Sequence, residues 1–197
     1  MNEPHPIVPM FPLPSYFLFP AAASPLRVFE PRYRQMVGDM LDGPGRLVMA
    51  CVDPDHVHEM SGDPPVLPIG GLGEIARHRE LPNGEYTMWV VGITRVRIEE
   101  VASDRLYRQV VAHPLEDDGE DVPGAEVTHR LRSAIAVHGG NDLELPDEAS
   151  PGFLADVLAQ CLPLPAPELR ACFEELDVPR RCEMVLSAHE ARAGSGG

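Results

Sequence analysis

The stretch MFPLPSYFLFP, residues 10–20, decides how the first half of this chain folds. It contains three prolines, yet seven of its eleven residues are large and apolar, which is unsuited to an exposed tail. Because proline lacks a backbone N–H, the segment suits a strand at a sheet edge followed by a crossing loop. We expect Leu13, Leu18 and Phe19 to be buried, with Phe19 near a helix that starts at Glu30-Pro31.

That helix is the clearest element of the first half. Apolar residues recur from Phe29 to Leu41 at i, i+4, i+7, i+8, i+11 and i+12, which makes one continuous helical stripe. Pro31 suits the first helical turn, and Gly43-Pro44-Gly45 ends the helix.

The remainder of the first half is predicted to form strands at residues 47–52, 66–81, 86–101 and 107–115. Gly70, Gly71 and Gly73 indicate a bulge or a close backbone crossing, and Pro82-Asn83-Gly84 indicates a hairpin turn. Many short strands with glycine kinks and one helix favour a small closed or pseudo-closed barrel.

Beyond an acidic connector at residues 114–126, the apolar spacing becomes helical. Helices are predicted at 125–138, after the Ser150-Pro151 cap, and twice more before residue 187. Short connections favour antiparallel packing of neighbouring helices. The expected domains are a barrel at 1–118, a helical bundle at 119–192 and a flexible tail at 193–197.

Composition limits the function classes. The chain has 197 residues and a net charge of −15, which repels nucleic acid and anionic membranes. No segment reaches the roughly 18 apolar residues of a membrane span, and the N-terminus does not resemble a signal peptide. The four cysteines form no C-x-x-C pair, so we expect buried, reduced thiols in a cytoplasmic protein rather than a disulfide or metal framework.

Few residues suggest chemistry. DPDHVHE, residues 53–59, gathers metal-ligand types, but a solvated loop is the simpler interpretation. GGLGE, residues 70–74, lacks the Lys-Ser/Thr of a phosphate-binding loop and is interpreted as a strand bulge. We therefore predict no catalytic, cofactor-binding or metal-binding residues.

Four arginines form a basic cluster in this acidic chain: Arg95, Arg97, Arg105 and Arg108. A solvated strand face paired with Glu99 and Glu100 is the simpler interpretation of this cluster. A contact with an acidic partner is the alternative.

A family resemblance extends these predictions. PMFPLPSYFLFPAAASPLRVFEPRYRQMV, residues 9–37, closely resembles the opening of the N-terminal, substrate-binding domain of the ATP-dependent Lon protease. The matching elements are Leu18-Phe19-Pro20, the Val28–Tyr33 motif VFEPRY, the turn at Pro82-Asn83-Gly84 and the strand from Gly92 to Arg95. The C-terminal part also resembles the family, in which Leu-Asp-Val precedes the last helix, as Leu176-Asp177-Val178 does here. The resemblance thus spans about residues 7 to 190.

The resemblance implies an α+β fold: a PUA-like β pseudo-barrel with one inserted helix, followed by a C-terminal α-helical bundle. Lon continues into an ATPase with a G-x-x-x-x-G-K-[ST] loop and a protease with a Ser-Lys dyad. This sequence ends at Gly197 with neither, so it resembles stand-alone bacterial proteins made only of this domain. A peptidase S16-like label would describe kinship, and we expect no hydrolysis.

Two function classes follow. The first is a non-catalytic polypeptide-binding module, an adaptor or recognition protein in protein quality control. Its partners would be unfolded or tagged polypeptides, with protease or chaperone machinery as further candidates, and not nucleic acid or membrane. The candidate binding surface comprises Tyr16, Phe17, Leu26, Trp89 and Arg95. The alternative is a small-ligand- or metal-binding protein, and so a candidate enzyme, with a pocket between barrel and bundle.

The placement of the opening stretch can be tested by mutation. Removing a buried phenylalanine side chain costs about 3–5 kcal/mol, so Phe19→Ala should lower the melting temperature strongly. A melting temperature close to that of the wild type would show that the stretch is placed wrongly.

Overall fold

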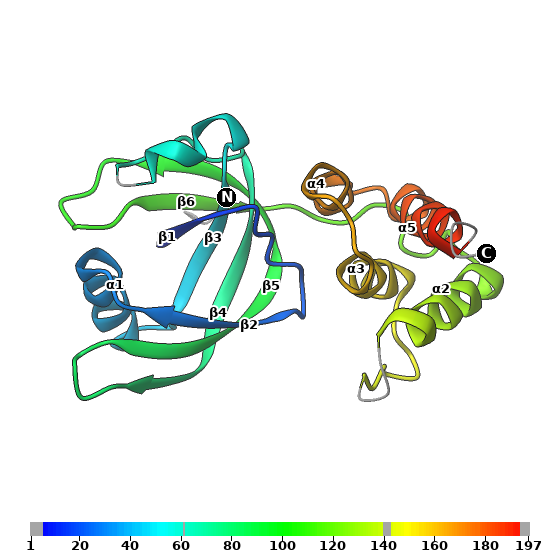
Figure 1. Ribbon diagram of the computed structural model, residues 1–197, viewed down its shortest axis with the longest axis horizontal. Coiled ribbons are helices and arrows are strands. Elements are labelled where there is room, and N and C mark those ends of the chain that lie inside the picture. The colour runs from blue at the N-terminus through cyan, green and yellow to red at the C-terminus, as the bar shows by residue number, and fades with distance from the viewer. Residues whose placement is uncertain (1–5, 61, 140–142, 194–197) are drawn as a thin grey trace, which may run out of the picture. The chain divides into compact units, whose positions relative to one another are not determined.

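The computed structural model describes residues 6–60, 62–139 and 143–193 (Figure 1). The chain divides into two compact units, Met1–Leu115 and Glu116–Gly197. The first unit contains β1 (Ile7–Pro14), β2 (Ala23–Val28), α1 (Pro31–Leu41), β3 (Arg46–Val52), the 3-10 helix η1 (Pro54–Glu59), β4 (Ile69–Glu80), β5 (Tyr86–Val101) and β6 (Gln109–Pro114). The second contains α2 (Ala125–His138), α3 (Pro151–Cys161), α4 (Ala166–Glu174) and α5 (Val178–Ala193). The predicted tail falls almost entirely outside the described residues.

The six strands form one sheet that curls into a pseudo-barrel. Their order is β2-β5-β4-β3-β1-β6, and an additional pairing joins β5 to β6. The length of β5 makes this possible, because its first half pairs with β2 and its second half pairs with β6. The predicted α+β fold, with one inserted helix in the barrel and C-terminal helices, is confirmed.

Residues 15–22, between β1 and β2, cross over β4 and β5 at positions where both strands carry glycine; they are called the crossing segment. A Cβ atom on Gly71 would collide with the carbonyl oxygen of Leu18, and one on Gly92 would collide with that of Phe19. Any larger residue at either position would push the crossing segment off the strands. The close crossing predicted from the glycines is therefore present.

Hydrogen bonds fix the crossing segment in place. The Ala21 N–H donates to the Gly92 carbonyl at 2.8 Å, and the Gly92 N–H donates to the Ala22 carbonyl at 2.9 Å. The β4–β5 register also shifts between Leu72 and Gly73, so the predicted bulge accompanies the crossing.

The crossing segment supplies part of the barrel core. Leu18 and Phe19 are fully buried, as predicted, whereas Leu13 is half-buried. Leu18 belongs to a core cluster that includes four residues of α1: Tyr33, Met36, Val37 and Met40. Phe19 lies with its ring 5.6 Å below the guanidinium carbon of Arg95.

Before α1, one expectation is wrong and one strand was missed. Phe29, predicted to begin the buried helical stripe, is 61% exposed and lies two residues before the first residue of α1, Pro31. β2 was not predicted as a strand, since its sequence ASPLRV shows little β-propensity and contains a proline. Its pairing with β5, a long-range contact, makes it one.

The helical unit is held by a buried charge network. Arg181 of α5 is fully buried and pairs with Asp117 of the connector and with Asp156 of α3, 3.1 Å from the latter. The predicted Ser150 cap is present, since its side chain accepts from the Phe153 N–H at 3.3 Å. The network ties the connector to two helices, and removing one partner would leave a buried charge unpaired.

The glycine crossing gives a matched pair of stability predictions. Gly92→Ala should destabilise the protein by about 1–3 kcal/mol or more, because the added methyl group meets backbone that cannot rotate away. Gly38→Ala should instead stabilise it by about 0.5–1 kcal/mol, because Gly38 lies in the interior of α1 with open space around it. Chemical denaturation of both variants measures the difference, and equal effects would contradict the crossing.

Candidate functional site

The five residues predicted as one binding surface lie in three different environments. Trp89 is 48% exposed on β5. Tyr16 and Leu26 are half-buried, and both pack against the core cluster that contains Leu18. Phe17 and Arg95 are buried, at 8% and 2% exposure, so their inclusion in an exposed surface was wrong.

Arg95 is buried because of the crossing segment. It pairs in register with Gly71, and register partners in an antiparallel ladder share a face. The crossing segment lies against that face at Gly71, so it covers Arg95 as well. The alternation of residues in β5 correctly indicates two faces. The face that carries Arg95, Arg97 and Glu99 was interpreted as solvated, but the crossing segment covers it at Arg95.

The rest of the predicted basic cluster is at the surface. Arg97 and Arg105 are exposed, and Arg108 is half-buried. Arg108 donates to both carboxylate oxygens of Glu100, at 2.8 and 2.6 Å, and this hydrogen bonding lowers the pKa of Glu100. The pairing of Arg108 with Glu100 agrees with the simpler interpretation, an ion-paired strand face.

The pseudo-barrel is open between β1 and β2. Within the described residues, β2 has β5 as its one strand neighbour, so its other edge is free. β1 pairs with β3 through Met10–Pro14 but with β6 only through Ile7–Pro9. Between the two edges lies an apolar groove of about 190 Å³, here called the seam groove. Six large apolar residues line it, Phe11, Leu13, Leu26, Val28, Phe29 and Tyr33, together with Pro12, Arg27, Glu30 and Met60.

The two walls of the seam groove differ in their backbone donors. The Met10 N–H of β1 donates toward β6, to the Arg108 carbonyl, so by alternation Pro12 and Pro14 point their nitrogens to the same side. Proline nitrogens carry no hydrogen, so the β1 wall offers few donors there. This is the edge placement that the sequence predicted for these prolines.

The β2 wall does carry donors. The Gly92 N–H donates to the Ala22 carbonyl. By alternation along β2, the backbone N–H and C=O groups of Leu26 and Val28 then also point toward β5. The intervening residue Arg27 therefore directs its backbone N–H and C=O groups to the free edge. Another extended chain could hydrogen-bond to this edge.

A second surface lies on the outside of the same strands. Trp89 pairs in register with Pro25 of β2 and Arg77 of β4, and Thr87 pairs with Arg27 and Arg79. Register partners share a face, and all three arginines are exposed. The surface formed by these six residues is called the Trp89 face.

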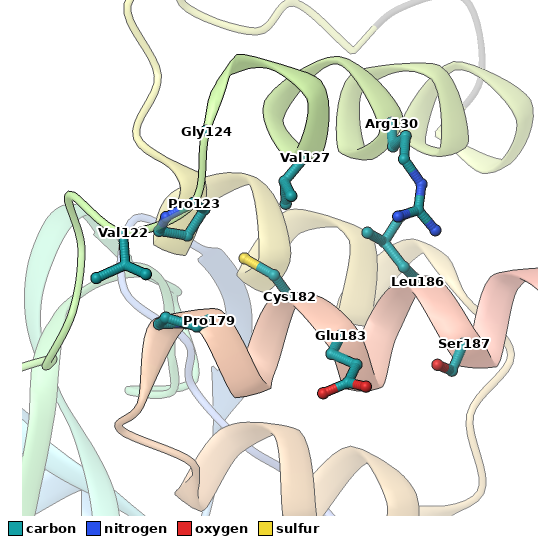
Figure 2. A pocket seen from close by; sticks show the side chains of 10 residues that line it. All are labelled: Val122, Pro123, Gly124, Val127, Arg130, Pro179, Cys182, Glu183, Leu186 and Ser187. Atoms are coloured by element: carbon teal, nitrogen blue, oxygen red, sulfur yellow. The ribbon is translucent and has the colours of Figure 1, made fainter.

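The helical unit has a cavity of about 410 Å³ between α2 and α5. In Figure 2, Val127 of α2 and Cys182 of α5 face each other across it, with Leu186 beside them. Burial raises the pKa of the Cys182 thiol to about 11, so it is a poor nucleophile at neutral pH.

The DPDHVHE motif, residues 53–59, does not form a recognisable metal site in the described residues. In DPDHVHE, His56 lies 3.9 Å from Asp53 and His58 lies 3.5 Å from Glu59, on the short helix η1. Across the described ranges, no three histidine, cysteine or acidic side chains converge as metal ligands. Among the helices in those ranges, none has the length and apolar character needed to cross a membrane.

Comparisons with known proteins agree with the predicted resemblance. Residues 7–188 match the family model of the ATP-dependent protease La (LON) substrate-binding domain. The chain is 24% identical to Lon protease of Brevibacillus choshinensis, over 91% of this chain and 24% of that protein. It is also 24% identical to Lon protease of Escherichia coli K12, over 93% of this chain and 24% of that protein. The chain thus spans about a quarter of the length of these relatives.

Solved structures share the fold. A Lon N-terminal domain protein from Xanthomonas campestris superposes with a TM-score of 0.71 at 22% identity, over 92% of this chain and 98% of that one. The N-terminal domain of Mycobacterium avium complex Lon protease superposes with a TM-score of 0.68 at 15% identity, over 94% of this chain and 98% of that one.

The raised pKa of Cys182 predicts low thiol reactivity. At pH 8 the thiolate fraction is about two orders of magnitude below that of an ordinary cysteine, so alkylation should be slower in the native than in the unfolded protein by at least that factor. Mass spectrometry of the Cys182 peptide over time measures this rate, and Cys161, which is half-buried, serves as the internal comparison. Rapid native labelling of Cys182 would contradict the burial.

Proposed function

The chain belongs to the family of ATP-dependent protease La (LON) substrate-binding domains, and from that premise we propose that it is a non-catalytic module that binds polypeptides. The observation that carries this proposal is the open seam, where the free edge of β2 borders an apolar groove. An edge and a groove together fit a chain in extended conformation.

In the proposed binding mode, an extended polypeptide adds to the sheet beside β2. Its backbone would pair with the outward-facing N–H and C=O groups of Arg27. Its alternate side chains would enter the seam groove against Leu13, Leu26 and Val28. A groove of about 190 Å³ suits a few apolar side chains of an extended segment.

This mode favours unfolded chains over folded ones. Backbone hydrogen bonds are independent of sequence, and the groove asks only for apolar side chains, which folded proteins bury. Because proline lacks an N–H, Pro12 and Pro14 on the β1 wall direct the pairing to β2. Phe29, at 61% exposure, adds apolar surface to the rim without being part of the core.

The wider role that we propose is recognition of unfolded or tagged polypeptides in protein quality control, as an adaptor for protease or chaperone machinery. The relatives that carry this domain are named Lon proteases, and the chain spans about a quarter of their length. The role therefore rests on the domain and does not include the activity of those longer proteins.

A matched pair of variants tests the strand addition. Arg27→Pro removes one backbone donor from the free edge, where proline is tolerated, whereas Arg27→Gln keeps the donor and removes the same charge. Binding of a reduced and alkylated, permanently unfolded protein should weaken by about fivefold or more in the first variant only. Fluorescence anisotropy measures the affinity. Equal loss in both variants would contradict backbone pairing at β2.

The apolar part of the site has its own control. Phe29→Ala should weaken the same binding by about threefold to tenfold, because it removes exposed apolar contact area. Leu106→Ala changes a similarly exposed residue, at 65%, that does not line the groove. No measurable binding of the unfolded protein at high micromolar concentration would overturn the proposed function itself.

A further inference from the structure

The Trp89 face combines an exposed indole with three arginines. Trp89 is 48% exposed, which is unusual for so large an apolar side chain at the centre of a sheet face. Arg77 lies directly opposite it on β4, and Arg79 lies diagonally, opposite Thr87. Side chains in these positions are within reach of one another across the strands.

The three arginines of this face differ in their pairing with nearby carboxylates. Arg27 pairs with Glu85 at 2.8 Å, so Glu85 is occupied. Glu74, the acidic residue opposite Val91, lies 3.1 Å from Arg46 and is also occupied. In the part of the chain that the structure describes, neither Arg77 nor Arg79 has a carboxylate partner.

This lack of partners is unexpected in so acidic a chain. The protein has 31 acidic residues and 16 basic ones, and all 16 are arginine. Several other arginines are closely paired, as in the contacts of Arg46 with Glu74 at 3.1 Å and Arg108 with Glu100 at 2.6 Å. Among the described residues, Arg34 and Arg97 likewise lack a carboxylate partner, but they are not adjacent on one strand face. Arg77 and Arg79 are two residues apart on one strand face, where like charges repel, and an added anion would relieve that repulsion.

From this arrangement we propose that the Trp89 face binds acidic stretches of a polypeptide. Carboxylates would pair with Arg77 and Arg79, and an adjacent apolar or aromatic side chain would pack on the Trp89 indole. This inference rests on the proposed function, because it names the class of polypeptide that the module selects.

A short acidic segment fits this face better than nucleic acid does. The net charge of −15 repels a long run of phosphates, whereas two or three carboxylates need only the local field of Arg77 and Arg79. The face is also next to the seam groove, because Arg27 of β2 lines the groove and belongs to the face. One unfolded chain passing β2 can contact both.

Two synthetic peptides test the proposal. They share the same apolar and aromatic residues and differ only in having glutamate or glutamine between them. The wild-type protein should bind the glutamate peptide about threefold to tenfold more tightly, the range expected for two exposed arginine–carboxylate pairs. Fluorescence anisotropy with each labelled peptide measures this ratio.

A matched pair of double variants assigns the preference to the face. Arg77→Gln with Arg79→Gln should bring the ratio of affinities to about one. Arg34→Gln with Arg97→Gln removes the same charge from two other exposed arginines of this unit and should keep the ratio. Melting curves verify folding, and the single variant Arg77→Gln replaces the double one if the latter is unstable.

Each other result has a definite meaning. Equal binding of both peptides by the wild-type protein, or an equal loss of preference in both double variants, overturns this inference and leaves the proposed function standing. Binding of neither peptide overturns both proposals. Binding of a single-stranded oligonucleotide that depends on Arg77 and Arg79, without a preference for the glutamate peptide, overturns the inference in favour of nucleic acid.

Discussion

The passage of Leu18 and Phe19 across the glycines of β4 and β5 is the constraint on which the barrel unit depends. Only glycine at Gly71 and Gly92 lets the crossing backbone approach so closely. Once it lies there, the next residues form β2 along the first half of β5, and the second half of β5 is left to pair with β6. The crossing also covers Arg95 and brings Leu18 into the core with α1.

The same path leaves the pseudo-barrel open on one side. β2 follows the crossing directly, so it joins the sheet at β5 and reaches no partner on its other edge among the described residues. A free strand edge is a liability unless it is blocked or used. On β1 the prolines block it, whereas on β2 the edge borders the seam groove. The geometry that completes the core therefore also creates the surface proposed to bind polypeptides.

Strand periodicity separates two kinds of chemistry on either side of β2. Leu26 and Val28 point to the groove and the core, whereas Pro25 and Arg27 point outward beside Trp89. A bound extended chain would meet apolar side chains on one side and arginines on the other. In a protein with a net charge of −15, such a local concentration of arginine would give the proposed specific contact without making the whole surface attractive to polyanions.

The sequence by itself determined the elements that depend on local chemistry. The periodicity and caps predicted α1, α2 and α3, the alternation and turn predicted β5 with its bounds, and the glycines predicted the crossing. The motif VFEPRY predicted the family. Tertiary structure alone decided the strand identity of β2, the burial of Arg95 and Phe17, and the separation of Trp89 from Leu26. Alternation distinguishes the two faces of a strand, but which face is covered depends on segments distant in sequence, and only the folded chain brings these together.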